Sequence, residues 1–358
     1  MIRLAASAYT IPTDAPEADG TLTWASTTLV LVEASFEATT GIGWTYGPAA
    51  ITQTIADLLA PAVHGIGVLD PPAAHERMRR AVRNAGRPGM CSMAISAVDC
   101  ALWDLKARRL RLPLHRLLGA VTEEVPVYGS GGFTTYDATR LREQLGHWTG
   151  EKGIPRVKIK IGEAWGTREA RDLERLWIAR DVIGADAELY ADANGAYNAK
   201  QAIRVAEEAP GLRWLEEPVS SDDLAGLRTV RDAVTCEVAA GEYGYDLPYF
   251  TRLIDAVDCP QADVTRVGGI TEFTRVAALA RAHGRDLSSH CAPHLHVAAM
   301  TAIPNARHIE WFHDHVRVES MLFDGVLDPS GGSVRPREDA PGLGLEFRRK
   351  DAEAYRVA

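Results

Sequence analysis

The sequence predicts an α/β fold in which a TIM-type barrel follows an N-terminal α+β unit. From about residue 125 onward, eight short β-branched runs alternate with helical stretches. Seven consecutive runs each end at an ionisable residue, and from Lys160 onward these residues are about 20 to 32 positions apart. Before residue 125 the order of predicted elements differs, because a strand pattern precedes helical patterns there instead of alternating with them.

The N-terminal unit is expected to span residues 1–122. Residues 22–35, LTWASTTLVLVEAS, have the composition of a β-strand, whereas residues 51–65 and 93–110 carry apolar side chains at helical spacing. Residues 10–20, TIPTDAPEADG, are rich in Pro, Asp, Ala and Gly, and we expect them to form a mobile loop.

The barrel is expected to span residues 123–324, and a segment rich in Pro, Gly and charge, residues 325–358, is expected to pack back on the first domain. The eight strand candidates are residues 125–130, 156–162, 187–195, 212–218, 236–242, 259–265, 285–290 and 307–312.

Composition and charge exclude several classes of protein. The net charge is -9, and without a basic stretch this argues against a nucleic-acid partner. No apolar run is long enough for a signal peptide or a membrane span, so we expect a cytoplasmic protein without a membrane partner. The five cysteines are scattered and include no CxxC pair, which is typical of reduced thiols.

Three carboxylates follow three neighbouring strands. Asp192 lies in YADANG, Glu216 in LEEP and Glu242 in AAGE. Carboxylates that meet at one barrel mouth repel each other unless a cation lies among them. An all-oxygen ligand set fits Mg²⁺ better than zinc, so we expect one Mg²⁺ per subunit, with Mn²⁺ as an alternative.

Two lysines share one face of the strand VKIKIG. With a period of two residues, Lys158 and Lys160 point into the barrel while their apolar neighbours face the helices. Two close ammonium groups lower each other's pKa, and a lysine brought toward neutrality can act as a base. Alternatively, both lysines neutralise the carboxylates, and the two roles are compatible if each lysine takes one.

Asp263 and His290 end neighbouring strands on the far side of the barrel. A carboxylate bonded to one imidazole nitrogen fixes the tautomer and raises the basicity of the other nitrogen. Glu310, one strand further, is a candidate to hydrogen-bond a substrate oxygen if it is protonated, or otherwise to support its neighbours.

Together these motifs resemble the enolase superfamily, specifically its mandelate racemase-like subgroup, over nearly the whole chain. The resemblance implies a capping domain on a modified (β/α)7β barrel, with Asp192, Glu216 and Glu242 as Mg²⁺ ligands. It also implies Lys160 as an acid/base, Asp263 and His290 as a dyad, and Glu310 as hydrogen-bonded to the enolate. Muconate-cycloisomerase-like enzymes carry a lysine base on the sixth strand. This chain has only Arg266 there, which stays protonated and argues against that subgroup.

The site predicts removal of the α-proton from a carboxylate substrate. Dehydration of an acid sugar to a 2-keto-3-deoxy acid is favoured, because the loops around the mouth are polar. Trp24, Trp44 and Tyr46 could line a pocket for a polyol, and plain packing is equally compatible with their positions. A racemase or epimerase and a catalytically silent ligand-binding relative are the alternatives. The resemblance also implies a homo-oligomer.

Overall fold

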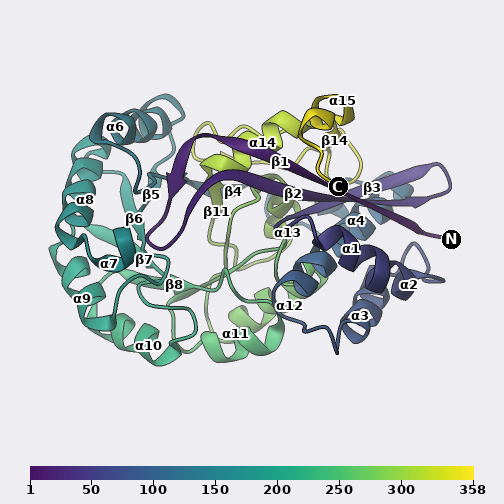
Figure 1. The fold of residues 1–358 in the computed structure, drawn as a ribbon, viewed down its shortest axis with the longest axis horizontal. Helices are drawn as coiled ribbons and strands as arrows, with labels where there is room; N and C mark the ends of the chain where they lie inside the picture. Colours follow the sequence, from purple (N-terminus) through teal and green to yellow (C-terminus); the bar gives the residue numbers. More distant parts are fainter.

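The structure is a computed structural model that describes residues 1–358. It confirms the predicted fold class: a three-stranded antiparallel sheet with its helices lies beside a barrel of eight parallel strands (Figure 1). The main apolar core contains residues of both parts, among them Leu31 of the sheet and Val238 of the barrel. The two parts therefore pack as one body. No helix is both long and apolar enough to cross a bilayer.

The capping domain is built on strands in the order β1-β2-β3. These are β1 (Arg3–Ala18), β2 (Thr23–Phe36) and β3 (Thr39–Tyr46). The helices that follow are α1 (Ile51–Thr54), α2 (Ala60–Val63), α3 (Pro71–Ala81), α4 (Met90–Leu110) and α5 (Leu114–Leu118), with a π-helical turn, Ile55–Leu59, between α1 and α2. Gly41 and Gly43 of β3 let α4 lie close, because a Cβ at either position would come within 2.4 Å of a helix atom.

The prediction of a mobile loop at residues 10–20 is wrong for most of its length. Residues up to Ala18 continue β1 and form a long hairpin with β2, which crosses over the barrel (Figure 1). Pro12 and Pro16 misled the prediction because proline usually interrupts a strand. Here β1 is an edge strand, where a missing N–H can be tolerated.

The tip of this hairpin is seated on the barrel. The amide of Trp165 donates to the Gly20 carbonyl at 2.9 Å, and the amide of Thr134 donates to the Ala18 carbonyl at 2.8 Å. A Cβ on Gly20 would lie 2.8 to 2.9 Å from three backbone oxygens of the barrel loops. Only a glycine can approach the rim this closely without displacing it.

The barrel strands follow one another around the barrel in sequence order. They are β4 (Val125–Gly131), β5 (Arg156–Lys160), β6 (Glu188–Asp192), β7 (Leu212–Glu216), β8 (Glu237–Ala240), β9 (Cys259–Ala262), β10 (Ser288–Ser289) and β11 (Ile309–Phe312). All eight coincide with predicted strands. β11 pairs in parallel with β4, and the Ser289 amide donates to the His308 carbonyl at 3.1 Å, so that the ring is closed.

Helices cover the outside of the barrel. They are α6 (Ala138–Gly146), extended by a π-helical turn (His147–Glu151), the short turn α7 (Glu163–Gly166), α8 (Glu169–Ile183), α9 (Ala199–Glu208), α10 (Leu224–Ala233), α11 (Leu247–Leu253), α12 (Gly269–Ala282), α13 (Pro293–Thr301) and α14 (His313–Leu322). Each begins after the carboxyl end of a strand, so the strand–helix loops gather at one rim (Figure 1).

The last segment contacts both domains. β12 (Phe323–Asp324) pairs with β14 (Glu346–Phe347), and β13 (Ser333–Val334) pairs with β4. After α15 (Arg349–Ala352) and a 3₁₀ turn (Glu353–Tyr355), the amide of Val357 donates to the Ala8 carbonyl of β1 at 2.8 Å. The domain boundaries at residues 122 and 324 remain predictions.

Candidate active site

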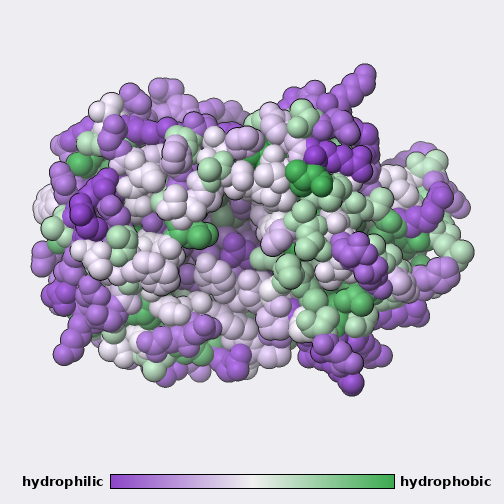
Figure 2. Space-filling view, in the orientation of Figure 1, coloured by the Kyte–Doolittle hydropathy of each residue, from purple (hydrophilic) through white to green (hydrophobic).

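Of the eight ionisable residues predicted to form the site, six lie at or just beyond the carboxyl end of a barrel strand, and Lys158 and Glu310 lie within β5 and β11. All eight side chains are buried: Lys158, Lys160, Asp192, Glu216, Glu242, Asp263, His290 and Glu310. The barrel face that carries them is hollowed at its centre (Figure 2).

The three predicted metal ligands converge. One carboxylate oxygen from each of Asp192, Glu216 and Glu242 lies within 4.8 Å of the others. Oε2 of Glu242 is buried and makes no hydrogen bond, although His290 Nε2 lies 3.4 Å away, and a buried carboxylate oxygen without a hydrogen bond is costly unless a cation or proton reaches it. The geometry therefore fits a hard divalent cation such as Mg²⁺.

Neighbouring side chains fix Glu216 within this cluster. Its oxygens accept hydrogen bonds from Gln261 Nε2 at 2.9 Å and from Trp214 Nε1 at 3.1 Å. Burial, reinforced by Asp192 and Glu310 and opposed by Lys158, raises the pKa of Glu216 to about 8. Crowded carboxylates of this kind favour a bound cation.

The two lysines point into the barrel as predicted. Lys158 Nζ lies 2.5 Å from Glu216 Oε1 and 2.7 Å from Glu310 Oε1, and Lys160 Nζ lies 2.5 Å from Asp192 Oδ2. Each lysine thus contacts a member of the carboxylate cluster.

The expected mutual lowering of the lysine pKa values is wrong for this charge arrangement. Burial alone would lower the pKa of Lys160, but Asp192, together with Glu242 and Glu310, outweighs burial and Lys158 and raises it. The pKa of Lys158 is raised as well, against burial, by Glu216 and Glu310. The spacing of the two lysines in the sequence shows only that they lie beside each other. It does not show how closely the carboxylates approach them, and these short distances determine the direction of the pKa shift.

His290 and Asp263 form the predicted pair. Nδ1 of His290 lies 2.8 Å from Asp263 Oδ2, while the other oxygen of Asp263 accepts the Thr265 amide at 2.7 Å. Burial would lower the pKa of His290, but Glu242 and the bond to Asp263 raise it above its ordinary value. The dyad therefore favours a protonated imidazole whose Nε2 faces the carboxylates.

Glu310 lies between the lysine side and the histidine side of the barrel. Its Oε1 accepts from the Ser130 hydroxyl at 2.6 Å, and its Oε2 accepts from the Cys291 amide at 2.8 Å. Burial would raise the pKa of Glu310, but Lys158 and His290 hold it well below the usual range. Glu310 is consequently a carboxylate acceptor in this charge arrangement, not a protonated donor.

Several side chains at the site were not predicted. Arg266 Nη1 lies 3.2 Å from Glu242 Oε1, so it contacts a predicted metal ligand. Cys291 Sγ lies 3.3 Å from His290 Nε2, and the Lys160 ammonium lies 5.9 Å from the ring centroid of Phe312. The contacts of Arg266 and Phe312 join different strands, so no local sequence pattern indicates them, whereas Cys291 directly follows His290 in the chain.

Two of the three aromatics considered for a polyol pocket pack instead between the domains. Trp44 Nε1 and Tyr46 Oη donate to Glu319 Oε1 of α14 at 3.2 and 2.9 Å, and both side chains are buried. Trp24 donates from Nε1 to Glu17 Oε2 at 2.8 Å and packs edge-on against Phe133.

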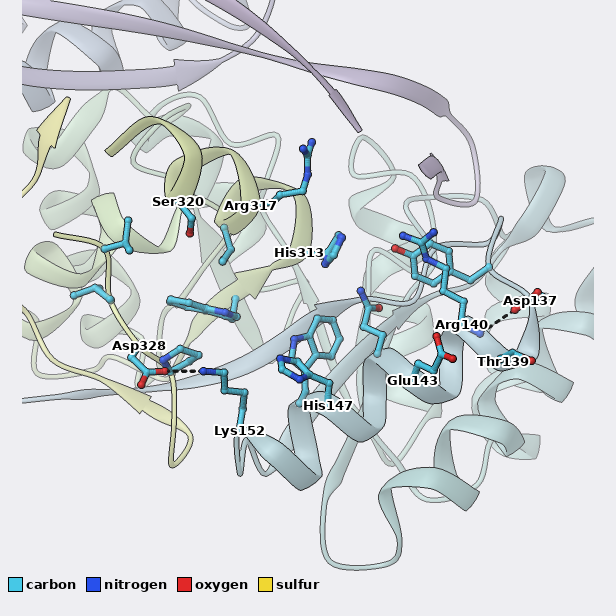
Figure 3. Close-up of a pocket in the computed structure, with 18 residues that line it drawn as sticks. Asp137, Thr139, Arg140, Glu143, His147, Lys152, His313, Arg317, Ser320 and Asp328 are labelled. Carbon is cyan, nitrogen blue, oxygen red and sulfur yellow. Dashed lines mark hydrogen bonds and ion pairs between the residues drawn. The ribbon is translucent and has the colours of Figure 1, made fainter. Parts of the chain in front are cut away.

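The largest cavity, about 1030 Å³, lies away from the carboxylate cluster. It runs along α6 and α14, outside the strand ring (Figure 3). Two of its charged side chains form ion pairs: Lys152 Nζ is 3.2 Å from Asp328, and Arg140 is 3.2 Å from Asp14. None of the eight predicted site residues lines this cavity.

Comparison with known proteins identifies the family. Residues 140–352 match the family described as "Enolase C-terminal domain-like", and residues 7–119 match "Mandelate racemase / muconate lactonizing enzyme, N-terminal domain". The chain belongs to the enolase superfamily. Within it, the mandelate racemase/muconate lactonizing enzyme fold accounts for both domains described above.

Curated enolase-superfamily relatives include dehydratases and cycloisomerases. The chain is 35% identical to an L-talarate/galactarate dehydratase of Salmonella typhimurium over 80% of its own length and 74% of the relative. It is 33% identical to a 3,6-anhydro-alpha-L-galactonate cycloisomerase of Streptomyces coelicolor, over 87% of the chain and 86% of the relative.

Solved structures of the superfamily superpose closely. A mandelate racemase/muconate lactonizing enzyme-like protein from Rubrobacter xylanophilus matches with a TM-score of 0.96 and 52% identity, over 99% of both chains. An L-talarate dehydratase from Polaromonas sp. JS666, complexed with Mg and L-glucarate, matches with a TM-score of 0.88 and 28% identity, over 100% of this chain and 98% of that one.

Proposed function

We propose that the chain catalyses the Mg²⁺-dependent dehydration of an acid sugar to a 2-keto-3-deoxy acid. The observation that carries the proposal is one ring of strand ends that holds three converging carboxylates, a buried lysine pair and a hydrogen-bonded Asp–His dyad. Relatives named for dehydration of talarate, galactarate, arabinonate, gluconate and rhamnonate support this choice of reaction.

In this proposal Asp192, Glu216 and Glu242 hold the cation. When bound, Mg²⁺ would offset the charge of these carboxylates and stabilise negative charge on the substrate carboxylate, which acidifies the α-proton. Lys160 would then be held less firmly in its protonated form, because Asp192, whose Oδ2 lies 2.5 Å from Lys160 Nζ, would share its negative charge with the cation.

The lysines and the dyad divide the proton transfers. Neutral Lys160 removes the proton from the α-carbon, and Lys158 contributes positive charge next to the substrate carboxylate. Protonated His290, oriented by Asp263, donates a proton to the β-hydroxyl, which leaves as water. The resulting enol tautomerises to the 2-keto acid, while Glu310 accepts a hydrogen bond from the substrate.

A racemase or epimerase would use the same residues. If His290 returned a proton to the α-carbon instead of protonating a leaving hydroxyl, the stereocentre would be inverted without loss of water. We also propose that the chain forms a homo-oligomer and acts in the cytoplasm.

Proton NMR in D₂O tests the proposal. The protein is incubated with Mg²⁺ and a panel of aldonic and aldaric acids, and the spectra are followed over time. Loss of one acid with appearance of a 2-keto-3-deoxy product is the expected result. Deuterium incorporation at the α-carbon without dehydration would instead support a racemase or epimerase. No change across the panel, with Mg²⁺ binding intact, would contradict dehydration and favour a silent ligand-binding relative.

A further inference from the structure

A second cleft opens at the barrel rim next to the carboxylate cluster. Its volume is about 630 Å³. Thr21 of the hairpin tip and Pro88 of the capping domain contribute to one side, and the loops after β5 to β8 contribute the rest. Elements that meet here come from both domains, as in many small-molecule sites.

Two residues that line the cleft lie next to proposed metal ligands along the chain. Asn194 follows Asp192 by two positions, and its backbone N–H donates to Asp192 Oδ1 at 2.9 Å. Glu217 directly follows Glu216. Asn194 and Glu217 have positive φ values of 45° and 38°, an unfavourable conformation for non-glycine residues that is concentrated at functional sites.

Three polar groups in this cleft lack hydrogen-bond partners within the protein. They are Asn194 Oδ1, Glu217 Oε1 and the Tyr249 hydroxyl, all of them buried atoms. The Ser221 hydroxyl is close enough to Tyr249 to affect its pKa, but not in hydrogen-bond geometry. Burying a polar group without a partner is energetically costly, so three in one cleft indicate a ligand that supplies hydrogen bonds.

The walls add aromatic surface and one free positive charge. Trp165 and Tyr243 are 68% and 43% exposed and offer faces against which the C–H groups of a sugar chain can pack. Arg252 also lines the cleft, is exposed, and takes part in no ion pair of the protein. Hydroxyl donors with a terminal carboxylate would satisfy these groups together.

We propose that this cleft binds the hydroxylated end of the acid sugar, beyond its two reacting carbons, and that Arg252 favours substrates with a second, terminal carboxylate. Substrate hydroxyls donate to Asn194 and Glu217 and exchange a hydrogen bond with Tyr249. The inference rests on the proposed function, since it takes an acid sugar as the ligand.

Two variants separate the hydroxyl and carboxylate contacts. Tyr249→Phe removes only the hydroxyl, and Arg252→Gln removes only the charge. The matched controls are Tyr355→Phe and Arg142→Gln, neither of which lines the cleft. Kinetic constants are measured with a hexaric acid, the corresponding hexonic acid and glycerate, which lacks the distal chain. Equilibrium binding of the same acids to the Mg²⁺-loaded protein is followed by tryptophan fluorescence.

Tyr249→Phe should weaken binding of both six-carbon acids by about 2- to 10-fold, the effect of one neutral hydrogen bond, and leave glycerate unchanged. Arg252→Gln should weaken binding of the hexaric acid by about 10-fold and leave binding of the hexonic acid unchanged. The controls should match the wild type.

The two proposals can fail separately. If the protein turns over an acid sugar, and the kinetic and binding constants of Tyr249→Phe and Arg252→Gln equal those of the wild type, the cleft assignment is overturned while the proposed dehydration stands. Absence of turnover, with binding that still depends on Tyr249, would overturn dehydration and preserve the cleft. Equal loss for glycerate and the longer acids would also overturn the cleft assignment, because the effect would then originate at the reacting carbons.

Discussion

The hydrogen bond between Asp263 and His290 provides a quantitative test of the proposed mechanism. Both side chains are at most 6% exposed, and the bond length is 2.8 Å. Asp263→Asn preserves the size of the side chain and removes its charge. Since the Thr265 amide occupies one oxygen of Asp263, the asparagine would turn its NH₂ group toward His290 Nδ1. An NH₂ group there opposes a proton on Nδ1.

The magnitude follows from the strength of that bond. A hydrogen bond to a charged group contributes about 1.5–3 kcal/mol, so the pKa of His290 should fall when this bond is lost. A proton donor with a lowered pKa is deprotonated at a lower pH, and the alkaline limb of the pH–rate profile should shift down accordingly. The same free energy corresponds to a loss of about 10- to 100-fold in kcat near neutral pH, and the wrong tautomer would add to it.

The assay is kcat against pH with the acid sugar identified by NMR, together with the proton NMR titration of His290 in the Mg²⁺-loaded protein. Asp181→Asn is the control, because its ion pair with Arg142 is largely exposed and contributes little. Activity within about threefold of the wild type, with an unshifted profile, would refute the role of the dyad.

Further perturbations test the cation site and the hairpin. Glu242→Gln should weaken Mg²⁺ binding more than about 10-fold in a calorimetric titration, and an unchanged titration would show that the site is misplaced. Gly20→Ala should lift the hairpin tip and accelerate hydrogen exchange of the Trp165 amide. Gly146→Ala, where a Cβ meets open space, should not change this exchange. Equal exchange rates in both variants would contradict the docked tip. Burial and the nearby Asp314 raise the pKa of Glu17 to about 8, from an ordinary value near 4.5. Its protonated form therefore stabilises the fold at low pH, and this contribution should be lost as the pH rises from about 4.5 to 8, by up to about 5 kcal/mol. Glu17→Gln should flatten the fall in a plot of unfolding free energy against pH, and a fall of unaltered size would exclude Glu17 as its source.

The strand order and the predicted site residues could be inferred from the sequence. In a parallel barrel, the spacing of residues along the chain determines where they lie around the rim. Residues such as Asp192 and Glu216 follow their strands directly, so their place at the rim depends only on where each strand ends. Period-two alternation likewise placed Lys158 and Lys160 on one face. Neither inference required knowledge of tertiary packing. The assignment of ligand and acid/base roles to these residues remains a proposal.

Features that depend on contacts between distant elements were not accessible. Glu319 was not singled out, yet it is fully buried and accepts from Trp44, Tyr46 and the ring of His294. The pKa direction of Lys160 was wrong because it depends on a distance of 2.5 Å to Asp192, which no spacing rule provides. The hairpin was mistaken for a loop because an edge strand tolerates proline.

The long hairpin is divided by a register shift between Pro12 and Glu17. From Arg3 to Pro12, β1 pairs with β2 without interruption, and this half belongs to the rigid capping sheet. The part beyond the shift carries the tip that touches the barrel rim. Sequence changes in the tip need not disturb the sheet or the catalytic strands. Exchange of this tip between homologues is therefore a natural route for evolution, or for an engineer, to alter which acid is accepted while the proton-transfer machinery stays intact.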